Sequence, residues 1–183
     1  MARQRFTGFD GGRRIAAGPL HDILPAMKAA IDRGSDGPVL VFNDETGRVV
    51  DIDYRGTIKD VLARIETPEP RRPGRPKLGV VAREVTLLPR HWDWLGTQPG
   101  GASVALRKLV EAALRGSGDL DRIRQAQESA YRFMTTLAGN RPGFEEAMRA
   151  LFAGDRDGFA DRIASWPADI RDHAATLAAP GFL

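Results

Sequence analysis

The chain has 183 residues, of which 42% are hydrophobic and 28% charged. This length and balance exclude a globally disordered chain and allow one compact domain or two small ones. The absence of cysteine excludes disulfide bonds, thiol catalysis and zinc sites built on sulfur. The N-terminal stretch MARQRFTGFDGG holds no apolar run, and no segment approaches the ~20 apolar residues of a membrane span. We therefore expect no signal peptide, no membrane span and a cytoplasmic location.

The distribution of charge is more informative than the net charge of +3. Residues 67–118 carry nine Lys/Arg and four Asp/Glu. By contrast, residues 1–66 carry ten of each, and residues 119–183 carry eight Lys/Arg and ten Asp/Glu. A basic middle third between neutral and slightly acidic neighbours indicates a polyanionic partner. The alternative is a solvated basic face without a partner.

Residues 1–66 predict a small α+β domain of two hairpins and two helices. Asp-Gly-Gly within QRFTGFDGGRRIAAG, residues 4–18, is a strong hairpin signal. The strand-favouring residues of PVLVF and RVVDIDY, on either side of NDETG, predict a second hairpin over residues 38–54. Apolar residues at helical spacing predict a helix over residues 19–33. Thr57 is expected to cap the short helix IKDVLARI that follows it.

Residues 67–79, TPEPRRPGRPKLG, predict a basic linker or arm. Four prolines and two glycines disfavour a helix or a central strand here. We expect this segment to be extended and partly polyproline-like.

The remainder of the chain predicts one strand and otherwise helices. Residues 80–118 predict a strand, a short helix and a longer helix. Further helices are expected at roughly 119–138, 143–153, 155–165 and 167–179. The apolar stripes of these C-terminal helices predict core or dimer packing, with a small-molecule sensor pocket as the alternative.

Gly-Arg-Pro at residues 74–76, set between further cations, resembles an AT-hook, a motif that binds the minor groove of DNA. The resemblance implies that Arg75 enters a narrow A·T-rich groove, where the negative potential is enhanced. Gly74 would let the backbone approach closely, and Pro76 would keep the chain extended. The flanking cations, which would meet phosphates, are Arg71, Arg72 and Lys77. A plain basic linker is the alternative.

The order of elements over residues 80–115 resembles the ribbon-helix-helix family of DNA-binding proteins. The strand VAREVTLL precedes a helix that starts at Pro89 and a second helix that Ser103 is expected to cap. The resemblance implies a dimer in which two such strands pair and enter the major groove. The start of the second helix would donate N–H groups to a phosphate. A lone strand with two helices cannot hide its edge and apolar faces, which also favours a dimer.

The segment departs from the ribbon-helix-helix pattern in two respects. Its first helix is short, about two turns before Gly96. Its strand offers few base-reading side chains, with Arg83 on one face and Thr86 on the other, which weakens hydrogen-bonded base readout. Dimerisation without DNA binding is therefore an alternative. Trp92 is expected in the core on the same face as Leu95.

The stretches LLPRHWDWLGTQPGGASVALRKLVEAA and WPADIRDHAATLA resemble an uncharacterised bacterial family of unknown function, DUF2239. That resemblance implies no activity.

We expect no enzyme active site, no metal site and no cofactor. The sequence pairs no nucleophile with a base, and no serine lies in a nucleophile elbow. The histidines His21, His91 and His173 lack ligand spacing.

The sequence therefore predicts an α+β fold in four regions. These are a small hairpin and helix domain (1–66), a basic linker or arm (67–79), a ribbon-helix-helix-like dimerisation unit (80–118) and a helical C-terminal region (119–183). We expect a cytoplasmic, nucleoid-associated homodimer that binds double-stranded, A·T-rich DNA as a transcriptional regulator or an architectural protein. The alternative is an antitoxin-like or other protein-interaction module whose arm binds an acidic protein. The residues expected at DNA are Arg71, Arg72, Gly74, Arg75, Pro76, Lys77, Arg83, Thr86, Arg90 and Ser103.

Overall fold

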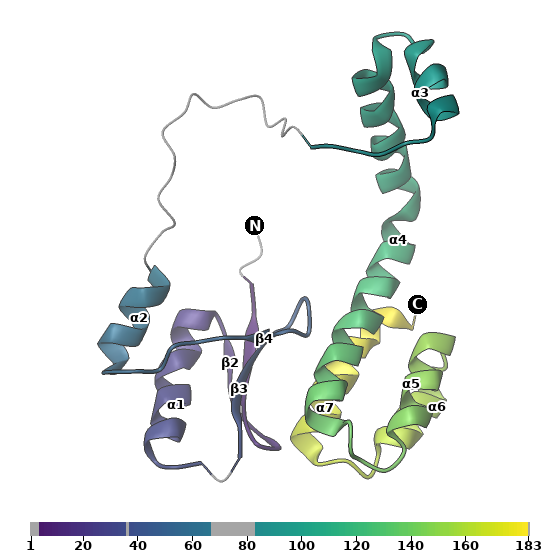
Figure 1. The fold of residues 1–183 in the computed structure, drawn as a ribbon. Helices are drawn as coiled ribbons and strands as arrows, with labels where there is room; N and C mark the ends of the chain where they lie inside the picture. The colour runs from purple at the N-terminus through teal and green to yellow at the C-terminus, as the bar shows by residue number, and fades with distance from the viewer. Residues whose placement is uncertain (1–3, 36, 67–82, 183) are drawn as a thin grey trace. The chain divides into compact units, whose positions relative to one another are not determined.

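The structure is a computed structural model that describes residues 4–35, 37–66 and 83–182 (Figure 1). The chain divides into two compact units. The first combines residues 1–67 with 120–183, and the second consists of residues 68–119. The sequence predicts separate regions for residues 1–66 and 119–183, whereas the structure joins these two segments in one unit. Across the described ranges, no helix is both long and apolar enough to cross a membrane.

The first unit contains a four-stranded antiparallel sheet in the order β2-β1-β3-β4. Its strands are β1 (Phe6–Asp10), β2 (Arg13–Gly18), β3 (Val39–Asn43) and β4 (Val49–Val50). Gly11, with φ 54°, occupies the left-handed region in the β1–β2 turn, as the Asp-Gly-Gly signal requires. Both predicted hairpins are confirmed, although β4 is only two residues long.

The sheet is covered on both faces, and its side chains alternate between the two layers. One layer joins the sheet to helix α1 (Leu20–Asp32) through Phe6, Ile23, Met27 and Val41. The other joins Phe9 and Phe42 to the C-terminal helices. Burial on both faces explains why VLVF reads as a continuous apolar run rather than an alternating one.

Helix α2 (Ile58–Glu66) starts at the expected cap. The Thr57 hydroxyl accepts a hydrogen bond from the backbone N–H of Asp60 at 3.3 Å, and the Asp60 carboxylate accepts one from the backbone N–H of Thr57 at 2.8 Å. Such a reciprocal pair caps the first turn of a helix.

The C-terminal helices follow the sequence prediction closely. They are α5 (Phe144–Ala153), α6 (Arg156–Ile163) and α7 (Ala168–Ala178), followed by the 3₁₀ turn η1 (Ala179–Gly181). Trp166, just before α7, is buried, and its indole N–H donates to the carbonyl of Pro142 at 2.9 Å. This bond ties the start of α7 to the loop that precedes α5.

The second unit contains α3 (Pro89–Gly96), which begins at Pro89 as expected, and the first half of α4 (Gly101–Ala138). The predicted strand is absent over residues 83–88, where the backbone forms neither helix nor strand. A strand needs a neighbouring ladder to satisfy its N–H and C=O groups, and within the described residues none pairs with this segment.

Helix α4 corrects two further expectations. The two predicted helices around residue 118 form one continuous helix, because interior glycines such as Gly116 and Gly118 each cost only about 1 kcal/mol. Ser103 is not the N-cap. It is an exposed residue inside the first turn, because the left-handed Gly100 and Gly101 start the helix earlier.

In α3, Trp92 is 43% exposed and does not share the buried face with Leu95, which is 2% exposed. Its expected place in the core is therefore wrong. The helix has only two turns, and Leu95 is its single buried residue.

Candidate functional site

The predicted DNA-contacting residues fall into two groups. Those of the arm lie outside the described residues: Arg71, Arg72, Gly74, Arg75, Pro76 and Lys77. The others, Arg83, Thr86, Arg90 and Ser103, are exposed in the second unit. Arg83 and Thr86 belong to the segment before α3, Arg90 to the first turn of α3 and Ser103 to the first turn of α4.

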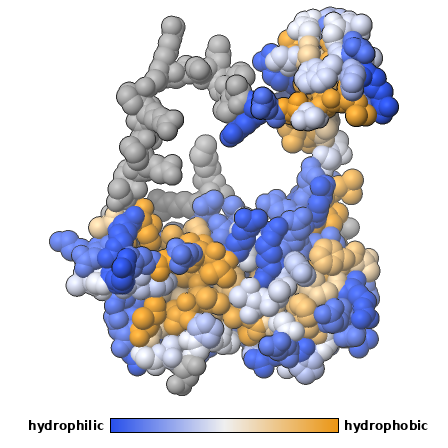
Figure 2. Space-filling model, in the orientation of Figure 1, coloured by the Kyte–Doolittle hydropathy of each residue, from blue (hydrophilic) through white to orange (hydrophobic). Residues whose placement is uncertain are grey.

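The second unit also exposes a large apolar surface, part of which is visible in orange over α3 and α4 in Figure 2. The exposed side chains are Val85, Leu88, Trp92, Trp94, Leu109, Val110 and Leu114. Between α3 and α4 lies an apolar cleft of about 270 Å³, lined by Leu87, His91, Trp94, Leu95, Leu106 and Leu109. Exposed apolar side chains grouped in this way are typical of interaction surfaces.

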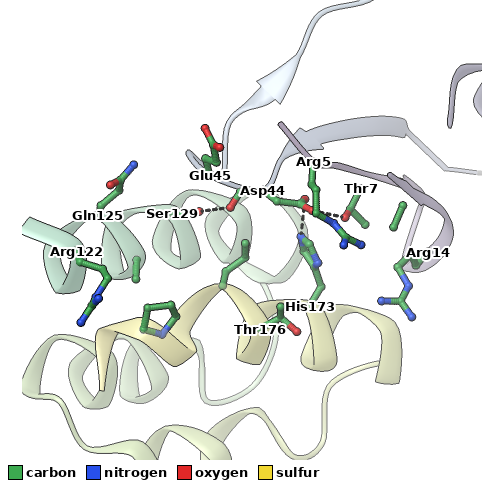
Figure 3. Close-up of a pocket in the computed structure, with 14 residues that line it drawn as sticks. Arg5, Thr7, Arg14, Asp44, Glu45, Arg122, Gln125, Ser129, His173 and Thr176 are labelled. Carbon is green, nitrogen blue, oxygen red and sulfur yellow. Dashed lines mark hydrogen bonds and ion pairs between the residues drawn. The ribbon is translucent and has the colours of Figure 1, made fainter. Parts of the chain in front are cut away.

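A cavity lies in the first unit, in a region that the sequence did not indicate (Figure 3). It has a volume of about 610 Å³. Its lining comes from the start of the sheet, the β3–β4 turn, the second half of α4 and α7. The polar residues of the lining are Arg5, Thr7, Arg14, Asp44, Glu45, Arg122, Gln125, Ser129, His173 and Thr176.

The β3–β4 turn places Asp44 in this pocket. The Asn43 side chain accepts hydrogen bonds from the N–H groups of Glu45 at 2.9 Å and Thr46 at 3.1 Å, which closes the turn locally. Gly47, with φ 64°, then passes so close to α4 that a Cβ there would lie 2.0 Å from the carbonyl oxygen of Ser129. Only glycine permits this approach.

Two hydrogen bonds hold the same turn against α4. The Ser129 hydroxyl donates to the backbone carbonyl of Asp44 at 3.4 Å. The Arg132 guanidinium donates to the carbonyl of Thr46 at 3.0 Å. The position of Asp44 is therefore set by α4, a helix that lies far from the turn in the sequence.

His173 reaches the pocket from the buried face of α7, which also carries Ile170, Ala174 and Leu177 at helical spacing. Its side chain is buried, with 4% of the residue exposed. The imidazole meets the ring of Phe133 edge-on, with centroids 4.6 Å apart, and lies 5.5 Å from the ring of Phe9. A hydrogen bond connects β2 to the start of α7. The backbone N–H of Arg14 donates to the Asp169 carboxylate at 2.9 Å.

Asp44 and His173 face each other across the floor of the pocket. The distance from Asp44 Oδ1 to His173 Nε2 is 3.7 Å, too long for a hydrogen bond. Asp44 Oδ2 accepts a hydrogen bond from the Thr7 hydroxyl at 3.1 Å. Within the described residues, neither Asp44 Oδ1 nor His173 Nε2 has a hydrogen-bond partner.

Burial shifts the titration of both groups. Desolvation, with a smaller contribution from the charge of Arg14, lowers the pKa of His173 to about 4, so the imidazole is neutral at pH 7. Desolvation also raises the pKa of Asp44, against the opposing effects of the Thr7 hydrogen bond and the Arg5 charge. Perturbed titratable groups that share a cavity are typical of functional sites.

The pair does not form a nucleophile–base arrangement, because the Ser129 hydroxyl is directed to a backbone carbonyl instead of to the imidazole. In the described part of the chain, no group of three or more metal-binding side chains gathers. The arrangement is instead suited to recognition of a polar ligand. The one sequence signal for this pocket is a histidine on the apolar stripe of WPADIRDHAATLA. That signal does not identify Asp44 as the neighbour of the histidine.

The fold defines an α+β protein in which a small sheet and a set of helices enclose a charged pocket, and a second unit exposes an apolar surface. The chain belongs to DUF2239, described as an uncharacterized protein conserved in bacteria, whose family model matches residues 5–178. No curated protein and no solved structure matches the chain significantly.

Proposed function

We propose that this protein is a homodimer that binds duplex DNA, assembled through α3 and the first part of α4. The observation that carries the proposal is the apolar surface of the second unit. Val110 is 55% exposed and Leu114 is 60% exposed, and they lie one turn apart on α4. Removing such a stripe from water stabilises an association by about 25 cal/mol per Å².

A second copy of the chain is the partner that suits this surface best. A stripe along one helix can pack against the same stripe across a two-fold axis, so that each subunit covers the other. Residues 83–88 leave their backbone groups without a ladder. Antiparallel pairing with the same segment of a second copy would satisfy one edge of each strand and form the two-stranded ribbon.

The partner of that dimer is proposed to be DNA because this part of the sequence is basic. Residues 67–118 carry nine Lys/Arg against four Asp/Glu, and Arg83 and Arg90 are exposed. Cations in this number supply the phosphate contacts that dominate DNA affinity. The few base-reading side chains favour low sequence specificity, as in an architectural protein of the nucleoid.

The dimer is tested by sedimentation of the full chain. The variant Val110→Glu/Leu114→Glu places charges on the stripe and should convert a dimer into a monomer. Phe152→Glu is the matched control, because Phe152 is 54% exposed and belongs to α5 of the first unit. A parent protein that is monomeric at tens of micromolar would contradict the proposed assembly.

DNA binding is tested by fluorescence anisotropy on A·T-rich and G·C-rich duplexes at several salt concentrations. We expect affinity to fall steeply with salt and the A·T preference to disappear in Arg75→Ala. Arg75→Lys should also weaken the A·T preference, because lysine fits the narrow groove less well. Arg149→Ala, exposed on α5, is the control. Absence of binding at low salt would overturn the proposal in favour of a module that binds an acidic protein.

A further inference from the structure

The pocket of the first unit holds two features that together indicate a ligand. One is a pair of buried polar atoms, Asp44 Oδ1 and His173 Nε2, which find no hydrogen-bond partner within the described residues. Burial of such atoms costs free energy unless something bonds to them. The other is a set of cations at the rim, where three guanidinium groups outnumber the two carboxylates of the lining.

The geometry of the pair suits one bridging group. An oxygen or nitrogen at ordinary hydrogen-bond distance from both atoms can span their 3.7 Å separation. Because the imidazole is neutral at pH 7, its Nε2 either donates or accepts, according to the tautomer, while the carboxylate only accepts. A hydroxyl group can donate to Asp44 and accept from His173, so it satisfies both atoms.

The arginines suit an anion beside that hydroxyl. Arg5 lies near enough to Asp44, and Arg14 near enough to His173, for their charges to affect the pKa values of those groups. In Figure 3 the side chains of Arg14 and Arg122 lie on either side of the Asp44–His173 pair. Guanidinium groups bind carboxylate and phosphate oxygens through two parallel hydrogen bonds.

We propose that this pocket binds a small metabolite that carries an oxyanion and a neighbouring hydroxyl group. Arg5 and Arg14 hold the oxyanion, and the hydroxyl bridges Asp44 and His173. The pocket volume of about 610 Å³ accommodates a molecule of this size. The binding site lies in the first unit and does not depend on the proposed DNA binding.

The test is a titration of the full-length protein, followed through its three imidazole groups by long-range ¹H–¹⁵N NMR. Single His→Gln variants assign the signals. The probes are glycerol 3-phosphate and lactate, which carry a phosphate or a carboxylate beside a hydroxyl. Inorganic phosphate and propionate lack the neighbouring hydroxyl. We expect at least one hydroxylated probe to shift the His173 signals saturably at millimolar concentration, while His21 and His91 stay unchanged.

Matched variants separate a site from general charge attraction. Arg5→Gln and Arg14→Gln should each weaken binding by about tenfold or more, the effect of losing one charged hydrogen bond. Arg149→Gln removes an exposed cation outside the pocket and should leave binding unchanged. The proposal is overturned if neither hydroxylated probe shifts His173 saturably, or if all three variants weaken binding equally. Equal affinity of lactate and propionate, together with equal affinity of the two phosphates, would contradict the hydroxyl bridge.

Discussion

The imidazole of His173 lies among aromatic rings, at 4.6 Å from Phe133 and 5.5 Å from Phe9, measured between centroids. Water is excluded from most of its surface, and this favours the neutral form of the side chain. Its Nε2 lies 3.7 Å from Oδ1 of the Asp44 carboxylate. A sequence can indicate a histidine on a buried helical face, but the pKa of that histidine depends on neighbours that only the folded chain supplies.

This environment predicts a pH dependence of stability. Between pH 6.5 and about pH 4, the unfolded chain binds a proton at His173 that the folded chain does not. The free energy of unfolding should therefore fall as the pH falls through this window, by about 3 kcal/mol in total, and this contribution should level off below it. Asp44 has a raised pKa, so its contribution has the opposite sign. As the pH falls, Asp44 takes up a proton at a higher pH in the folded chain than in the unfolded chain, and this uptake stabilises the fold.

Urea denaturation at pH 7.5, 6, 5 and 4 measures the effect. We expect His173→Gln to lose less stability than the parent between pH 6.5 and 4, whatever the packing cost of the substitution at pH 7.5. His21→Gln removes an exposed imidazole and serves as the matched control. An identical loss in the parent and in His173→Gln would show that the imidazole is not held neutral by the fold.

At the scale of the element, α4 is the helix whose length exceeds expectation. The sequence predicts two helices that meet near residue 118, yet one helix continues from Gly101 to Ala138. Nothing lies within 4 Å of the position that a Cβ would take at Gly116 or Gly118. Both glycines therefore weaken the helix only through their backbone freedom.

Replacing these glycines with alanine should strengthen the helix. Gly116→Ala and Gly118→Ala should each raise its stability by about 1 kcal/mol and slow hydrogen exchange of the amides around them. Gly101→Ala is the contrasting variant, because Gly101 has φ 72° and alanine there costs roughly 1–2 kcal/mol. Faster exchange in the Gly116 and Gly118 variants would mean that these residues end the helix in a left-handed conformation.

At the scale of the whole molecule, the first unit is assembled from the two ends of the chain. Phe9 and Phe42 of the sheet pack on Phe133 of α4, with ring centroids 5.4 Å and 4.9 Å from that of Phe133. The sheet therefore buries one of its faces only when the C-terminal helices are present. Residues 4–66 and 120–182 should unfold as one cooperative unit.

Phe133→Ala tests this cooperativity. Loss of the buried ring should cost about 3–5 kcal/mol and should reduce hydrogen-exchange protection in β1 and β3 as well as in α4. Phe152→Ala, at a side chain that is 54% exposed, should cost much less. Protection that falls in α4 while β1 and β3 stay protected would show that the two segments are independent domains.

The sequence by itself determined most of the local structure of this protein. Helix and strand positions follow from apolar spacing and from Gly and Pro, and these are properties of neighbouring residues. The hairpins, the Thr57 cap and the C-terminal helices could all be predicted for this reason. The continuity of α4 and the exposure of Trp92 could not, since they depend on what packs against those positions.

Only the tertiary structure decided that Asp44 and His173 meet. Many arrangements of the same amphipathic elements would bury their apolar faces, and nothing local distinguishes one from another. The docking of the β3–β4 turn on α4, and of α7 under the sheet, selects the arrangement that brings a hairpin carboxylate and a helical imidazole to one pocket. The arm predicted at residues 67–79 is the opposite case, because that prediction rests on local sequence alone.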